Sequence, residues 1–506
     1  MTTTSSVIND ILDNRIASRI AAQDATVWGP EAQDEASKRL GWVDLHTRAN
    51  DIIEKVTGLA QTCEHDRVVL AGMGGSSLAP EVMSNAYGKD LIVCDSTHPD
   101  QVSYTAQDLD RTLVIIASKS GSTVETDSAR RFFTQKFRDT GIDPSSRLIA
   151  ITDPGSPLDQ RAAEEGWLAV FHADPSVGGR YSALTPFGLV PAGLVGVDIA
   201  QVVADATSIA PQLEQDSEDN LAVYLGALLG AAHENGYEKL ALDPHTEQFQ
   251  GLGVWIEQLI AESTGKDGKG ILPIAPQDCE SATTVALGAS DGRHADVVVD
   301  LPLGAQFLLW EYVTAIASYV IGVNPFDQPN VESAKAAMRE LLAGGEQMGS
   351  ALPVSLTDGA LTVSGPADLV EGAQSAAEVV DRLRAVIPQG GYVGLQAFVD
   401  RIGRSDLVRL RPQFAQRLGV ATTFGFGPRY LHSTGQYHKG GHANGVFVQI
   451  TDEASTDFDV PETGFTFGQL IAAQSRGDAN VLNDAGRPVL RFHLSGEDGY
   501  AQLFDL

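Results

Sequence analysis

Cysteine and basic residues are both scarce in this chain of 506 residues. It has only three cysteines, which lie far apart and show no metal-ligand spacing, so the sequence predicts a reducing, cytoplasmic environment. Lysine and arginine number 35 against 66 aspartates and glutamates, which gives a formal net charge of −31. A surface this acidic repels phosphate backbones and anionic lipid, so we expect neither a nucleic-acid partner nor a membrane partner.

The sequence also shows no pattern typical of a signal peptide. Residues 1–23 lack the basic start and apolar centre that such a peptide needs, so no export is predicted. One long apolar run, residues 303–323, carries Gln306 near its start and Glu311 near its middle. No second run of this kind occurs, and a soluble domain of this size can bury one helix on all sides, so we predict a buried helix rather than a membrane span.

What the chain does contain is enough apolar sequence, 43%, to build more than one core. Short β-rich runs, such as RVVLAG (67–72), TLVIIAS (112–118) and RLIAITD (147–153), alternate with helical stretches. This alternation predicts an α/β protein in which helices cover parallel sheets. A stretch rich in Gly, Ser and Pro from residue 344 breaks the pattern and is interpreted as a linker with a short hairpin.

These patterns predict three domains. We place a first α/β domain with an N-terminal helix at residues 1–200 and a second α/β domain at residues 201–343. Residues 344–506 form the predicted C-terminal α+β domain, in which VATTFGFG (420–427) and VFVQIT (446–451) are expected to be strands.

Two turns rich in glycine and serine follow predicted strands and open predicted helices. AGMGGSSLAP (71–80) is the first, and ASKSGSTVET (117–126) is the second, with four hydroxyls within six residues beside Lys119. Backbone N–H groups and hydroxyls at a helix N-terminus suit a phosphate group. A tight βα turn and ordinary N-caps are the alternatives, but four hydroxyls exceed what one cap requires, so we favour a phosphate cup. The spacing fits neither the dinucleotide fingerprint nor the P-loop.

Both turns resemble the phosphate-cup motifs of the sugar isomerase fold, in particular of the glucose-6-phosphate isomerase family. Three further stretches resemble motifs of that family in the same order, GGRYSALTPFGL (178–189), WIEQLIAESTGKDGKG (255–270) and NPFDQPNVESAK (324–335). The closest resemblance is to the isomerase half of the bifunctional transaldolase/glucose-6-phosphate isomerases, whose C-terminal region contains a stretch like GFGPRYLHSTGQYHKGG (425–441). No transaldolase half is seen, so the resemblance implies an isomerase alone, with two doubly wound parallel-sheet sugar isomerase domains and a C-terminal α+β region.

The resemblance implies interconversion of glucose 6-phosphate and fructose 6-phosphate through an enediolate, in glycolysis and gluconeogenesis, with no metal and no redox cofactor. Arg180 would stabilise the enediolate, and Lys335 would open the sugar ring. A surface ion pair is the alternative for Arg180, and a solvated helix lysine is the alternative for Lys335. By motif position the substrate-binding residues are Ser76, Ser118, Lys119, Ser120, Thr123 and Gln328.

The catalytic base is the point at which the sequence departs from the family pattern. The glycine-rich loop that carries the family's glutamate is not visible here. We predict Glu280 as the base, because it follows the strand-like GILPIAP (270–276), and Asp278 as the second choice. Glu262 matches a family helix position, to which we assign a structural role.

The ring-opening histidine is likewise not found at the position that the family pattern gives it. His432 and His438, in the basic and glycine-rich stretch 427–445, are preferred to His294 for this role. We expect this stretch to be a loop that is held between two strands and folds over the phosphosugar site. A non-catalytic sugar-phosphate-binding protein is the alternative function, and the resemblance suggests a homodimer.

Overall fold

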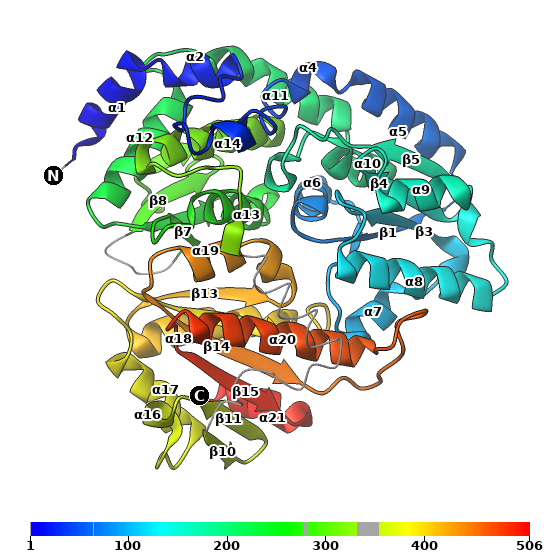
Figure 1. Ribbon diagram of the computed structural model, residues 1–506, viewed down its shortest axis with the longest axis vertical. Helices are drawn as coiled ribbons and strands as arrows, with labels where there is room; N and C mark the ends of the chain where they lie inside the picture. Colours follow the sequence, from blue (N-terminus) through cyan, green and yellow to red (C-terminus); the bar gives the residue numbers. More distant parts are fainter. Residues whose placement is uncertain (1, 64, 277–281, 331–353) are drawn as a thin grey trace. The chain divides into compact units, whose positions relative to one another are not determined.

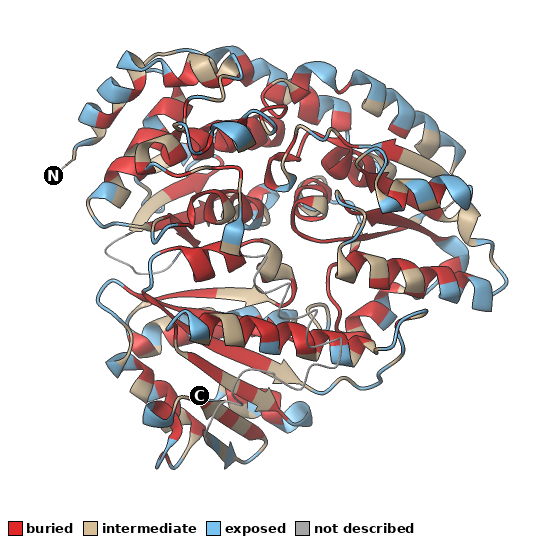
Figure 2. Ribbon diagram, viewed as in Figure 1, coloured by how far each residue is buried: buried red, intermediate tan, exposed pale blue. Residues whose placement is uncertain are grey.

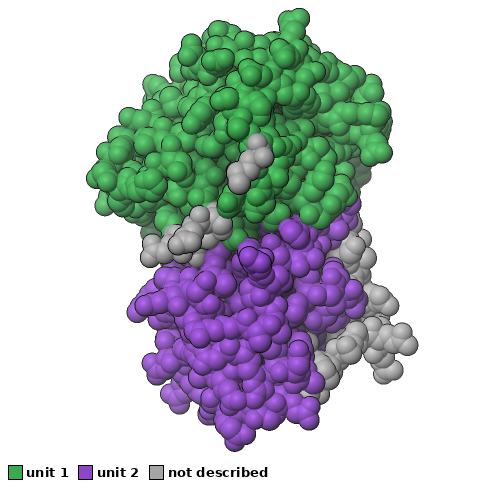
Figure 3. Space-filling model, turned by 90° about the vertical axis from the view of Figure 1, so that its left-hand side faces the viewer, with its two compact units in different colours: residues 1–95, 105–276, 281–328 green, residues 96–104, 277–280, 329–506 purple. Residues whose placement is uncertain are grey.

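The computed structural model describes residues 2–63, 65–276, 282–330 and 354–506. Its internal contacts divide the chain into two compact units, coloured separately in Figure 3. Unit 1 comprises residues 1–95, 105–276 and 281–328, and unit 2 comprises residues 96–104, 277–280 and 329–506. The segment 96–104 therefore packs with the C-terminal part of the chain, although its sequence neighbours belong to unit 1.

The first sheet of unit 1 is entirely parallel and has the strand order β2-β1-β3-β4-β5. Strands β1, β3, β4 and β5 are labelled in Figure 1. Its central strands are apolar runs rich in valine, isoleucine and leucine, and they are buried along almost their whole length, as parallel strands covered on both faces must be. Helix α8 packs on β1 and β3, α9 on β4 and β5, and α10 on β1. The strands are β1 (Arg67–Gly72), β2 (Ile92–Cys94), β3 (Thr112–Ala117), β4 (Leu148–Thr152) and β5 (Ala169–His172).

The second sheet of unit 1 is also parallel, with the order β7-β6-β8-β9. Strand β8 is not among the strands expected from the sequence, because four of the six residues of ATTVAL are alanine or threonine. Only the second half of the strand is buried. The parallel sheets and their helices confirm the predicted α/β fold. The strands are β6 (Lys239–Pro244), β7 (Leu272–Ile274), β8 (Ala282–Leu287) and β9 (Val297–Val299).

Helix α14, which spans the long apolar run, is buried throughout except at Tyr319 and Val320, as Figure 2 shows by its red ribbon. It packs against α11, α12 and α13, so the predicted buried helix is confirmed. None of the described helices combines the length and hydrophobicity needed to span a lipid bilayer. The helices of unit 1 are α1 (Thr4–Asp13), α2 (Ile16–Ala21), α3 (Gln33–Ala36), α4 (Leu45–Arg48), α5 (Asn50–Thr62), α6 (Leu78–Ala86), α8 (Val124–Asp139), α9 (Pro157–Glu164), α10 (Pro186–Leu194), α11 (Ile199–Leu213), α12 (Leu221–Glu234), α13 (Leu252–Thr264) and α14 (Leu303–Ile321).

Unit 2 has its own hydrophobic core around a mixed sheet of order β10-β11-β15-β14-β12-β13. Strands β10 and β11 form the predicted hairpin, and β11 pairs antiparallel with β15. Strands β15, β14, β12 and β13 pair parallel with their neighbours. Helix α7 (Pro99–Thr105) begins in the unit 2 segment 96–104. The strands are β10 (Val354–Asp358), β11 (Leu361–Gly365), β12 (Tyr392–Phe398), β13 (Ala421–Phe426), β14 (Gly445–Asp452) and β15 (Val489–Leu494). The other helices are α16 (Ala367–Val370), α17 (Ala376–Arg382), α18 (Leu410–Leu418), α19 (Gly435–Gly440), α20 (Phe467–Asp484) and α21 (Gly496–Phe504).

The two strands expected around the basic stretch are present as β13 and β14. The domain boundaries expected at residues 200 and 343 stay predictions, since both parallel sheets fall within unit 1.

Candidate active site

The two glycine- and serine-rich turns lie at the same edge of the first sheet. Strands β1 and β3 are direct neighbours, and their last residues, Gly72 and Ala117, are paired. Each strand runs straight into one of the turns, so Ser76 and Ser118 both follow the carboxyl ends of adjacent parallel strands. The chain order reverses here, because β2 lies on the other side of β1, and ligands of open α/β sheets bind at this kind of switch point.

The second turn forms a cluster of hydroxyls at the N-terminus of α8. Ser118 Oγ donates to Thr123 Oγ1 at 3.2 Å, and the Ser120 and Ser122 hydroxyls lie 3.2 Å apart. Thr123 is the N-cap residue of α8, but its side chain makes no capping hydrogen bond. The hydroxyls are therefore bonded mainly to one another at the positive end of a helix dipole, which suits an anionic ligand.

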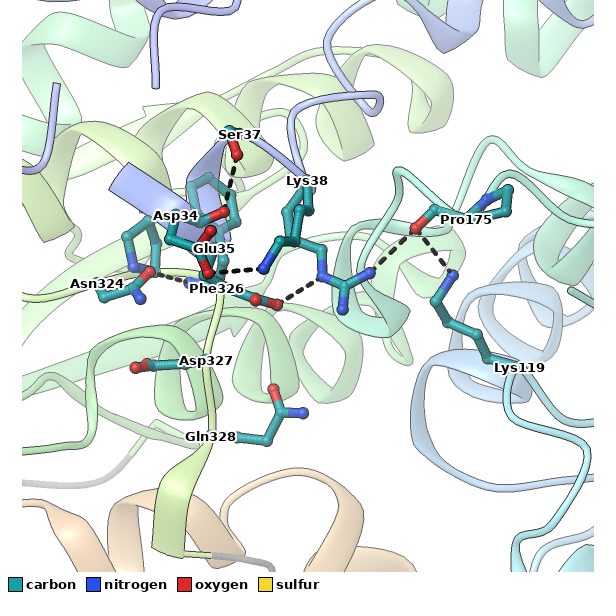
Figure 4. A network of polar contacts seen from close by, with 12 residues as sticks. Asp34, Glu35, Ser37, Lys38, Lys119, Pro175, Asn324, Phe326, Asp327 and Gln328 are labelled. Carbon is teal, nitrogen blue, oxygen red and sulfur yellow. Dashed lines mark hydrogen bonds and ion pairs between the residues drawn. The ribbon is translucent and has the colours of Figure 1, made fainter. Parts of the chain in front are cut away.

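The Lys119 side chain contacts residues that follow strands β4 and β5 of the same sheet. Its Nζ lies 2.8 Å from Asp153 Oδ2. It also donates to the Pro175 carbonyl oxygen at 3.4 Å, a contact drawn in Figure 4. This ion pair holds the lysine beside the cup and neutralises part of its charge. A substrate-binding role for Lys119 stays a prediction.

The first turn is packed against the arginine motif. A Cβ atom at Gly75 would lie 2.0 Å from the Gly179 carbonyl oxygen, a distance that no side chain can tolerate. Ser182 Oγ also donates to the Gly75 carbonyl at 3.1 Å. The glycine therefore permits the close backbone approach that brings the short helix Gly179–Tyr181, and with it Arg180, beside the first cup.

Arg180 is buried, and its guanidinium contacts two other segments of unit 1, helix α13 and residues 325–328. Its Nη1 donates to Gln328 Oε1 at 2.9 Å and lies 3.1 Å from Glu262 Oε1. Its Nη2 donates to the carbonyl oxygens of Pro325 at 2.8 Å and Asp327 at 3.0 Å. The arrangement excludes the surface ion pair considered from the sequence, because the Arg180 side chain is only 4% exposed.

A second buried cation, Lys266, fixes the segment that carries Gln328. Its Nζ lies 2.6 Å from Asp327 Oδ1 and donates to the carbonyl oxygens of Asn324 and Asp327, each at 2.6 Å. Figure 4 places Asn324, Asp327 and Gln328 along the same short segment. Burial, helped by the nearby positive charge of Arg180, lowers the pKa of Lys266 to about 8.

Glu262 is the site residue that sequence reasoning assigned to a structural role. It lies in the last turns of α13, where one carboxylate oxygen faces Arg180 and the other accepts a hydrogen bond from Gln258 at 3.0 Å. The side chain is 14% exposed, so the carboxylate is largely withdrawn from water. The available signal was an acidic residue in a mostly apolar helix, immediately before the STGK sequence that ends with Lys266.

Several predicted residues cannot be placed. Glu280 and Asp278 lie in the interval 277–281, and Lys335 lies in 331–353, so all three fall outside the described residues. His294 is placed, but its side chain is 86% exposed.

The basic stretch of unit 2 is not the loop that the sequence suggested. Residues 435–440 form α19, and every one of them is buried. The charge of Lys439 is matched by an ion pair with buried Asp478, which explains why basic residues are tolerated there. His438 Nδ1 lies 2.8 Å from Tyr392 Oη, and burial holds the pKa of His438 well below its usual range. The roles predicted for His438 and for half-buried His432 stay predictions.

Sequence comparison relates this chain to glucose-6-phosphate isomerases. The family model of phosphoglucose isomerase matches residues 43–295, which is half of the chain. A probable glucose-6-phosphate isomerase from Haloarcula marismortui is 32% identical over 244 residues, covering 47% of this chain and 53% of that protein, so the chain spans about half the length of this curated relative.

Two solved structures share the fold. A hypothetical protein from Thermus thermophilus superposes with a TM-score of 0.59 at 22% identity, covering 66% of this chain and 95% of its own. A glucose-6-phosphate isomerase from Chlamydia trachomatis gives a TM-score of 0.51 at 19% identity, covering 65% of this chain and 78% of its own. The match over residues 43–295, together with the geometry above, shows that the chain belongs to the phosphoglucose isomerase family.

Proposed function

We propose that this protein is an aldose–ketose isomerase that interconverts glucose 6-phosphate and fructose 6-phosphate through an enediolate, a step of glycolysis and gluconeogenesis. The observation that carries the proposal is the cluster of Arg180, Glu262 and Gln328 within unit 1. A reaction that moves a proton between two neighbouring carbons needs a carboxylate base and a fixed positive charge for the oxyanion. This cluster supplies both, with the charge and the base 3.1 Å apart.

In this proposal Glu262 is the general base. Its carboxylate lies next to the guanidinium that would stabilise the enediolate, so one substrate carbon can approach the base while the adjacent oxygens approach Arg180. Arg180 is held by the Pro325 and Asp327 carbonyls, which fixes its orientation before substrate binds. Glu280 stays the competing assignment, and variants of the two residues distinguish them.

The phosphate of the substrate is assigned to the two turns at the carboxyl edge of the first sheet. Ser76, Ser118, Ser120 and Thr123 would donate to its oxygens, and the N-terminus of α8 would add its dipole. Gln328 would position the sugar, since its amide is oriented by Arg180. Lys335 keeps its predicted ring-opening role. The homodimer stays a prediction. The cytoplasmic location also stays a prediction, and the free thiols of Cys63 and Cys94 are compatible with a reducing compartment.

The test is a coupled assay in which purified full-length protein is supplied with fructose 6-phosphate and the glucose 6-phosphate formed is oxidised by a dehydrogenase. We expect sustained turnover without added metal. Binding of fructose 6-phosphate with no turnover would instead support the non-catalytic sugar-phosphate-binding protein.

A further inference from the structure

Unit 2 contains a cavity of about 390 Å³ that the proposed function does not use. It lies at the carboxyl ends of three parallel strands, because its lining includes Phe398 of β12, Thr451 and Asp452 of β14 and His493 of β15. Helix α20 forms a further part of its lining. This position, and a volume within the range of small-molecule sites, are those of ligand pockets in other α/β sheets.

Two arginines line this cavity without a carboxylate partner among the described residues. Arg491 donates only to the neutral amide oxygen of Gln449, at 3.3 Å, and its buried Nε has no hydrogen-bond partner in the described ranges. Arg476, on α20, is exposed and forms no ion pair within the described part of the chain. Burial, and then the positive charge of Arg476, lower the pKa of Arg491, so the two guanidinium groups repel each other in the free protein.

The acidic groups of the lining do not compensate these charges, because they are already engaged or exposed. Asp452 faces His98 Nε2 at 3.0 Å and accepts from Tyr500 Oη at 2.5 Å. Asp457 accepts from the Gly468 backbone at 2.8 Å at the start of α20. The side chain of Glu453 is 82% exposed. The charges that lack a partner in this cavity are therefore cationic, in a protein whose net charge is −31.

We propose that the cavity binds a small phosphorylated metabolite whose phosphate group is held by Arg476 and Arg491. A phosphate dianion matches two adjacent guanidinium groups in charge and accepts their paired N–H donors. Phe398 and Ile471 give the wall an apolar part against which the carbon skeleton can pack. This site is distinct from the serine-rich cups, which belong to unit 1.

The experiment measures phosphate binding to full-length protein by ³¹P nuclear magnetic resonance titration, with inorganic phosphate and glycerol 3-phosphate as probes. All proteins carry Ser118→Ala and Thr123→Ala, so that binding at the unit 1 cup is weakened. We expect saturable binding that Arg476→Gln and Arg491→Gln each weaken about tenfold or more. Arg409→Gln, which removes an exposed arginine of unit 2 outside the cavity, is the matched control and leaves the affinity unchanged.

Because Arg491 is half-buried in a strand, its variant is also checked for folding by circular dichroism, and exposed Arg476 provides the independent test. Unchanged phosphate affinity in Arg476→Gln overturns the proposal. It is also overturned if neither phosphate probe binds saturably to the protein that carries the two cup substitutions. Isomerase activity is measured separately in the otherwise native protein, so failure here does not bear on the proposed function.

Discussion

The Arg180 guanidinium and the Glu262 carboxylate lie 3.1 Å apart and are both largely buried, with side chains 4% and 14% exposed. They come from different parts of unit 1, a turn after the first sheet and the end of α13. A buried pair of this kind contributes little net stability, but loss of one partner leaves the other charge uncompensated. The proposed proton transfer needs a base and a cation side by side, and this pair supplies both.

Arg180→Lys should lower kcat by about 10²–10³, although it keeps the charge, because lysine lacks the planar fork that contacts Glu262, Gln328 and Pro325 together. Steady-state kinetics with fructose 6-phosphate measure the effect. Arg138→Lys, at an exposed position of α8, is the control and should retain normal activity. A fully active Arg180→Lys enzyme would remove the assigned role.

Ser118→Ala combined with Thr123→Ala should raise KM far more than it lowers kcat. These hydroxyls are assigned to the phosphate, which does not react, and two lost hydrogen bonds to a charged group cost about 3–6 kcal/mol if they act independently. Thr62→Ala, at an exposed position of α5, serves as the control. An unchanged KM for fructose 6-phosphate in the double variant would exclude the cup assignment.

Gly75→Ala should impair both stability and activity, because its new methyl group would lie 2.0 Å from the Gly179 carbonyl oxygen and push the Arg180 turn away from the first cup. Urea unfolding and the coupled assay report the two effects. Gly58→Ala is the matched control, since nothing lies within 4 Å of its Cβ position in α5, and it should stabilise the protein by about 0.4–1 kcal/mol. Equal behaviour of the two variants would refute the close-approach argument.

Lys266 should make the free energy of unfolding depend on pH above neutrality. Its folded-state pKa of about 8 is below the reference value of 10.5, so between these pH values the unfolded chain binds more protons. Its contribution to stability is therefore present above pH 10.5 and is lost as pH falls to about 8, a change of about 3 kcal/mol.

Urea unfolding of Lys266→Met across this window should show a correspondingly smaller rise of stability with pH. Lys89→Met, at an exposed lysine, should follow the parent protein. A rise in Lys266→Met as large as in the parent would show that Lys266 is not the titrating group.

The sequence allowed the local features of the first sheet to be predicted, because β1, β3 and their serine-rich turns depend on neighbouring residues. It could not show that Glu262 faces Arg180, since that contact depends on how α13 packs against the arginine turn. The burial of α19 was missed for the same reason. Lys439 is basic in sequence, but Asp478, which neutralises it, lies on a different helix.

The most direct test of the account compares kcat for fructose 6-phosphate in Glu262→Gln and Glu280→Gln, with Glu247→Gln as an exposed control in unit 1. A general base contributes about 10²–10⁴ in rate. We predict that Glu262→Gln loses at least about a hundredfold in kcat with little change in substrate affinity, and that Glu280→Gln and Glu247→Gln stay near the parent value. Near-normal turnover in Glu262→Gln, with the loss appearing in Glu280→Gln instead, would contradict the account.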